Sequence, residues 1–157
     1  MIEVMVDETV AEEEPPGSDA VNVAVAAALD ASGLSGRASL CVRFSDDATV
    51  RQLNRDWRGK DRVTDVLSFP MQDGPDYRVS EPLGDIVLDW PFVRHEAERL
   101  GVTGQAHALH LIVHGVLHLI GYDHLNDVEA ERMQNLERRA MRQLGLHDPY
   151  PEGVTHV

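Results

Sequence analysis

The stretch "HGVLHLIGYDH", residues 114 to 124, constrains this chain more than any other segment. It places His114 and His118 four residues apart in an apolar helical run, so both imidazoles lie on one face with Cβ atoms about 5–6 Å apart. Gly121 favours a left-handed turn that ends the helix, and His124 follows three residues later. Three imidazole nitrogens can thus point at one ion, each about 2.0–2.1 Å from it. The segment predicts a three-histidine metal site.

Three neutral imidazoles leave one position of a tetrahedral ion open, which is typical of catalytic rather than structural sites. Zinc is the expected metal, although nickel, copper and cobalt accept the same ligands. The competing interpretation is a histidine cluster that only packs in the core. His107 and His110 extend the same helical stripe and either support the ligands or line a cleft.

The histidine spacing equals that of the metzincin peptidases, H-E-x-x-H-x-x-G-x-x-H. The peptidase general base is the glutamate after the first histidine, and Gly115 stands at that position here. A peptidase is therefore the poorer interpretation, because nothing adjacent replaces the base. Asp123 either accepts a hydrogen bond from a ligand imidazole or caps the next helix, and Asp85 either does similar work or ends a turn.

Periodicity and turn residues predict the remaining elements. Strands are expected over 2–6, 38–45, 64–70 and 84–89, with a surface loop over 71–82, and helices over 18–32, 46–57, 91–101, 103–120 and 127–144. Ser18 is expected to cap the first helix and Gly33 to end it. This order predicts an α+β fold, in which helices cover a small mixed β-sheet and the histidine-bearing helix is central.

A single domain is expected over 1–157. Its ends are predicted to be an acidic strand and turn over 1–17 and a tail over 146–157, in which His147 and His156 are unrelated to the site. No apolar run approaches the ~20 residues that cross a bilayer, and the acidic N-terminus lacks the positive charge of an export signal. Cys41 is the only cysteine. The cytoplasm is therefore the expected compartment, with no membrane partner.

The net charge of −13 taken alone argues against a nucleic-acid partner. Its distribution changes that conclusion, because residues 1–30 hold eight acids and no Lys or Arg. From Arg37 to Arg62 the chain holds seven basic residues against four acids, a local charge of +3. The segment predicts either a face that binds phosphates or an ordinary solvated face.

The histidine segment, with "NRDWRGKDRVTDVLSFP" and "LGDIVL", resembles the YbeY family of bacterial rRNA maturation factors over about residues 40–145. The resemblance implies a zinc-dependent endoribonuclease specific for single-stranded RNA. It implies a role in 3′-end maturation of the small-subunit 16S rRNA and in ribosome quality control. It also implies partners in small ribosomal subunit rRNA and in ribosomal or assembly proteins. The family's usual proline before "TD" is Val63 here.

The resemblance also implies roles for particular residues. His114, His118 and His124 correspond to the metal ligands, and Arg58 to an arginine that serves RNA processing. Arg58 is expected to bind a phosphate with its bidentate fork. Basic residues around it are expected to follow the RNA backbone, namely Arg55, Lys60 and Arg62. Two other functions stay open: a ribosome-assembly factor with a mainly structural metal, and a metzincin-like hydrolase of another substrate.

Overall fold

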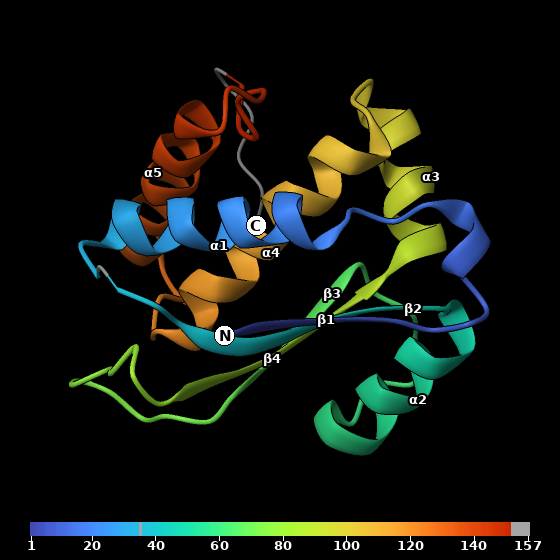
Figure 1. Ribbon diagram of the computed structural model, residues 1–157, viewed down its shortest axis with the longest axis horizontal. Helices are drawn as coiled ribbons and strands as arrows, with labels where there is room; N and C mark the ends of the chain where they lie inside the picture. The colour runs from blue at the N-terminus through green and yellow to red at the C-terminus, as the bar shows by residue number, and fades with distance from the viewer. Residues whose placement is uncertain (35, 152–157) are drawn as a thin grey trace.

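A computed structural model describes residues 1–34 and 36–151. It contains four strands, five α-helices and one short 3-10 helix (Figure 1). In chain order these are β1 (Ile2–Val6), η1 (Ala11–Glu13), α1 (Ser18–Ser32), β2 (Ser39–Ser45), α2 (Asp47–Arg58), β3 (Val66–Pro70), β4 (Pro82–Asp89), α3 (Trp90–Leu100), α4 (Gly104–Leu119) and α5 (Asp127–Gln143). The predicted α+β class and the predicted order of elements are confirmed.

The four strands form one mixed sheet in the order β1-β2-β4-β3. β1, β2 and β4 run parallel, which requires a long crossover such as α1 between neighbouring strands. β3 is the antiparallel edge strand and pairs with β4 from Val66 opposite Leu88 to Pro70 opposite Gly84. β4 begins two residues earlier than predicted, because Pro82 already pairs with Ser39 of β2.

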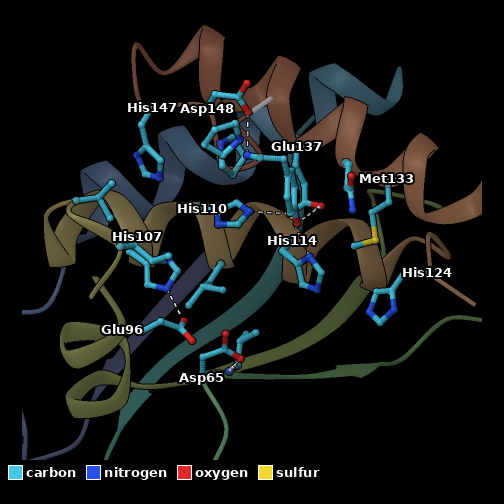
Figure 2. Close-up of a pocket in the computed structure, with 18 of the residues that line it drawn as sticks. Asp65, Glu96, His107, His110, His114, His124, Met133, Glu137, His147 and Asp148 are labelled. Atoms are coloured by element: carbon cyan, nitrogen blue, oxygen red, sulfur yellow. Dashed lines mark hydrogen bonds and ion pairs between the residues drawn. The ribbon is translucent and has the colours of Figure 1, made fainter. Parts of the chain in front are cut away.

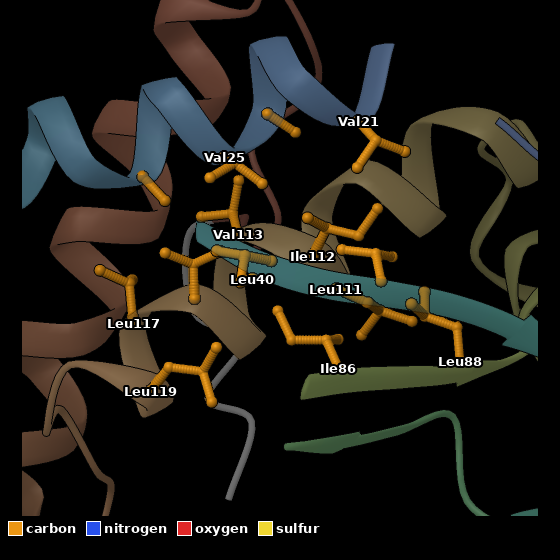
Figure 3. Close-up of a cluster of buried hydrophobic side chains, with 14 of the residues drawn as sticks. Val21, Val25, Leu40, Ile86, Leu88, Leu111, Ile112, Val113, Leu117 and Leu119 are labelled. Atoms are coloured by element: carbon orange, nitrogen blue, oxygen red, sulfur yellow. The ribbon is translucent and has the colours of Figure 1, made fainter. Parts of the chain in front are cut away.

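Helices cover both faces of this sheet (Figure 1). α1 and α4 lie on one face, with α5 beyond them, and α2 lies on the other face. Under α2 a small cluster forms from Val50, Leu67 and Val87. The larger core lies between the sheet and α1, α4 and α5, and the buried side chains of Val25, Ile86 and Ile112 meet there (Figure 3).

α4 is central to the larger core, as predicted. Its buried residues occur on every side of the helix, which is why its sequence is apolar almost throughout. No helix among the described residues is long and apolar enough to span a membrane.

Four of the five described α-helices begin at a side chain that caps the helix, and α1 is the exception. Asp46, Asp89, Thr103 and Asn126 each accept a backbone N–H bond at the start of a helix. The predicted cap at Ser18 is wrong: Gly17 occupies that position without a side-chain bond, and Ser18 is already the first helical residue.

The predicted tail is wrong for its first part. Tyr150 is only 5% exposed, and its backbone carbonyl accepts a hydrogen bond from Arg138 of α5 (2.8 Å). The chain after α5 therefore folds back onto that helix. Residues 152–157, which include His156, lie outside the described residues.

Candidate metal centre

Three histidines meet at the C-terminal end of α4. His114 and His118 lie one turn apart, and their Nε2 atoms approach to 3.0 Å. The ring of His124 lies 5.3 Å from that of His118 and 6.0 Å from that of His114, centroid to centroid. One nitrogen from each residue lies within 4.8 Å of the others.

This arrangement can hold one metal ion. A tetrahedral ion about 2.0–2.1 Å from each ligand nitrogen would separate two such nitrogens by about 3.3 Å, close to the spacing of His114 and His118. The third ring needs only a small adjustment to complete the set. Three imidazoles of this geometry suit zinc and also nickel, copper or cobalt.

Gly121 brings the third histidine back, as the sequence predicted. Its φ of +97° lies in the left-handed region, and its N–H bonds the carbonyl of His118 (3.1 Å) to close the end of α4. The turn also runs against Tyr77, because a Cβ added at Gly121 would lie 2.7 Å from the Tyr77 Oη. Both the backbone angle and the available space therefore require glycine.

A buried carboxylate that the sequence did not predict contacts His114, the first of the three histidines. Glu137 of α5 is 1% exposed, and its Oε1 accepts from Nδ1 of His114 (3.1 Å) and from Nε2 of His110 (2.7 Å). Tyr150 donates its hydroxyl proton to the same carboxylate, with its oxygen 2.9 and 3.0 Å from the two carboxylate oxygens. With Nδ1 of His114 acting as the donor, the lone pair of Nε2 is left facing the other two histidines.

Burial and hydrogen bonding together set the charges of this network. Burial by itself raises the pKa of Glu137, but bonds from His110 and His114 outweigh it and lower that pKa to about 2. Burial and the nearby His114 lower the pKa of His118 to about 4. At neutral pH the carboxylate is therefore ionised and His118 is neutral, which is the form that binds metals.

A cavity of about 530 Å³ lies beside the histidines (Figure 2). His114, His124 and Glu137 line it, together with Asp65 at the start of β3 and Glu96 of α3. Burial, followed by the negative charge of Glu96, raises the pKa of Asp65. The site thus combines three converging nitrogens with a hollow large enough for part of a ligand.

The other sequence candidates near the site have mixed outcomes. His110 bonds Glu137, the carboxylate that also bonds His114, whereas His107 bonds Glu96 (2.5 Å); both rings line the cavity. The interpretation of His147 as unrelated is wrong, because it lines the same cavity.

Neither role considered for Asp123 is observed among the described residues. Its carboxylate accepts from the backbone N–H of His124 (2.8 Å), while Asn126 caps α5. Asp85 lies within β4, paired with Cys41 and Phe69, so it does not end a turn.

One feature of the sequence indicates that Glu137 is buried. It lies four residues after Met133 and three before Ala140, which places it on the same face of α5 as these two apolar residues. A glutamate on such a face requires buried partners. No such signal marks Tyr150, Asp65 or Glu96, because their contacts with the site depend on packing between distant segments.

The chain matches known proteins over most of its length. A family model described as "Endoribonuclease YbeY" matches residues 7–145. The chain belongs to the YbeY family. Its relatives include the endoribonuclease YbeY of Stutzerimonas stutzeri, which is 50% identical over 75% of this chain and 74% of the relative. The endoribonuclease YbeY of Azorhizobium caulinodans is 44% identical over 84% of this chain and 86% of the relative.

A solved structure shares the fold of this YbeY-family chain. The solution structure of a Thermotoga maritima protein aligns with a TM-score of 0.58 and covers 95% of this chain and 98% of its own. The sequence identity of 24% limits that comparison to the fold. The predicted membership of the YbeY family is confirmed.

The basic residues of this YbeY-family chain lie apart from the histidines. Arg55 and Arg58 lie in the last turn of α2, Lys60 and Arg62 follow that helix, and all four are exposed. Among the described residues, none of the four lines the cavity. The chain links the two regions, since Asp65 at the cavity wall comes three residues after Arg62.

Proposed function

We propose that this protein is a zinc-dependent endoribonuclease that cleaves single-stranded RNA in the cytoplasm. Its proposed role is 3′-end maturation of 16S rRNA and ribosome quality control, on the small ribosomal subunit and alongside ribosomal or assembly proteins. The observation that carries the proposal is the convergence of three histidine nitrogens beside a cavity, in a chain of the endoribonuclease YbeY family.

The chain's own residues divide the proposed work. His114, His118 and His124 would hold the zinc ion, which when bound supplies Lewis acidity and lowers the pKa of water toward ~7. Glu137 keeps the proton of His114 on Nδ1. The cavity beside the histidines would receive the part of the RNA next to the scissile phosphate.

Cations on the α2 side would bind the rest of the RNA. Arg58 is exposed and makes no ion pair with any described residue, so its planar fork is available to a phosphate. Lys60 and Arg62 are likewise unpaired within the described chain, while Arg55 contacts Asp56 (3.4 Å). Binding that depends on such contacts weakens steeply as salt rises.

The test combines metal content with cleavage of a labelled single-stranded RNA and of its duplex. Wild-type protein prepared without a His-tag should hold about one equivalent of zinc and cut the single strand only. His118→Ala should lose both zinc and cleavage. His95→Ala removes an exposed histidine of α3 and should keep both.

Arg58→Glu separates RNA binding from metal binding. It should keep the zinc and lose most of the cleavage, because a negative charge repels the phosphate. A matched control is Arg78→Glu, which makes the same change at an exposed position of the β3–β4 loop.

Two outcomes would favour the other functions. Zinc-loaded wild type that binds the small subunit without cutting RNA would indicate an assembly factor. Cleavage of casein would indicate a peptidase.

A further inference from the structure

Trp57 is a large aromatic side chain that the fold does not use. It lies four residues after Leu53, and Val50 and Leu53 pack beneath the sheet with Leu67 and Val87. Trp57 continues this apolar side of α2, yet it is 73% exposed and joins neither cluster of packed hydrophobic residues. The chain's other tryptophan, Trp90, is 2% exposed and donates its Nε1 proton to a backbone carbonyl.

Positive charges surround this exposed ring. Residues 51–62 hold five basic residues against two acidic ones. The acids are already engaged, since Asp61 pairs with Arg51 (2.8 Å) and Asp56 with Arg55 (3.4 Å). Three cations remain that make no ion pair with any described residue: Arg58, Lys60 and Arg62.

The turn that carries these cations is fixed against α2. Gly59 adopts a left-handed conformation that ends the helix. The side chain of the buried Asn54 donates an N–H to the backbone carbonyl of Arg62 (3.0 Å). The backbone carbonyl of Asn54 accepts the N–H of Lys60 (3.2 Å). The turn that carries Lys60 and Arg62 is therefore held against α2, the helix that carries Trp57.

We propose that Trp57 stacks against a base of single-stranded RNA while the unpaired cations bind the neighbouring phosphates. An exposed aromatic face beside uncompensated positive charge is the combination that binds single-stranded nucleic acid without sequence preference. Bases in a duplex have no free face, so the contact selects single strands. This inference rests on the proposed RNA substrate.

The position of Trp57 is compatible with an RNA strand that continues into the cavity. The chain passes from the basic turn to Asp65 at the cavity wall, and the three residues from Arg62 to Asp65 span at most about 10 Å. An RNA strand bound at the basic turn therefore lies close enough to continue into the cavity past Asp65.

The experiment measures binding of a fluorescein-labelled oligoadenylate of 12 nucleotides to the full chain in EDTA, where cleavage is blocked. Trp57→Leu keeps an apolar side chain and removes the ring, and it should weaken binding roughly 5- to 100-fold. Trp57→Phe should weaken it less. The slope of log affinity against log salt should stay unchanged in Trp57→Leu and become shallower in Arg58→Ala, which loses a phosphate contact.

Intrinsic fluorescence gives a second readout. RNA should quench the emission of wild type and leave that of Trp57→Leu unchanged, because Trp90 is buried. Val23→Ala, which trims another exposed apolar side chain (57%) on the acidic helix α1, should bind RNA like the wild type.

Equal affinity of wild type and Trp57→Leu, both folded by circular dichroism, would overturn the stacking site while leaving the proposed nuclease intact. Quenching of the two proteins to the same extent would overturn it as well. Failure of wild type to bind the oligonucleotide at any salt would overturn the proposed function together with the inference.

Discussion

Replacing Gly121 by alanine tests whether the three-histidine site depends on the turn that returns His124. The φ of +97° at this position costs an L-amino acid roughly 1–2 kcal/mol. The new Cβ would also lie 2.7 Å from Oη and 3.0 Å from Cε2 of Tyr77, so the ring or the turn must move. We expect a total loss of about 2–4 kcal/mol in the free energy of unfolding, of which the collision supplies about half.

That loss has two measurable consequences. At about 2–4 °C per kcal/mol for a chain of this size, the melting temperature should fall by roughly 4–16 °C. Because His124 moves with the turn, the zinc affinity should fall about 10-fold or more, comparable to losing the support of a ligand. Thermal unfolding and competition with a zinc chelator measure the two effects separately.

Gly145→Ala is the matched control. Gly145 has a φ of +71°, but a Cβ there would meet no atom within 4 Å. It should lose only about 1–2 kcal/mol and keep the wild-type zinc affinity. Adding Tyr77→Ala to Gly121→Ala should recover the steric part of the loss. If Gly121→Ala is no less stable than Gly145→Ala and binds zinc as tightly as the wild type, the reasoning is refuted.

Two further predictions concern buried carboxylates. Glu137→Gln should weaken zinc binding roughly 10- to 100-fold in chelator competition, and Tyr150→Phe should weaken it less, since the charge of Glu137 remains. Unchanged affinity in both folded variants would contradict the support of His114. Burial and the neighbouring Asp47 raise the pKa of Asp89 from 3.8 to about 8. The folded state then holds a proton that the unfolded state releases near pH 4, so stability should decline as pH rises from about 4 to 8. Asp89→Asn keeps the helix cap and should flatten this decline in urea unfolding at pH 5 and pH 8; an unchanged slope would count against the assignment.

Much of the fold could be predicted because its signals are local. The period of apolar residues places α4 and α5, and Gly33 ends α1 at the predicted residue. The cap at Ser18 was predicted wrongly because a serine and the glycine before it compete for the same position. The predicted tail failed for Tyr150 because its burial depends on a bond to Glu137, thirteen residues away.

The sequence by itself determined the three histidines and the glycine turn between them. Helical spacing fixes the relation of His114 to His118, and a left-handed residue fixes the return of His124, all within eleven residues. Only the tertiary structure decided what surrounds them. Glu137 reaches His114 across 23 residues, and the cavity takes walls from β3, α3 and the segment after α5. The physical reason is that backbone geometry acts over a few residues, whereas a buried carboxylate finds its partners only where packed elements meet.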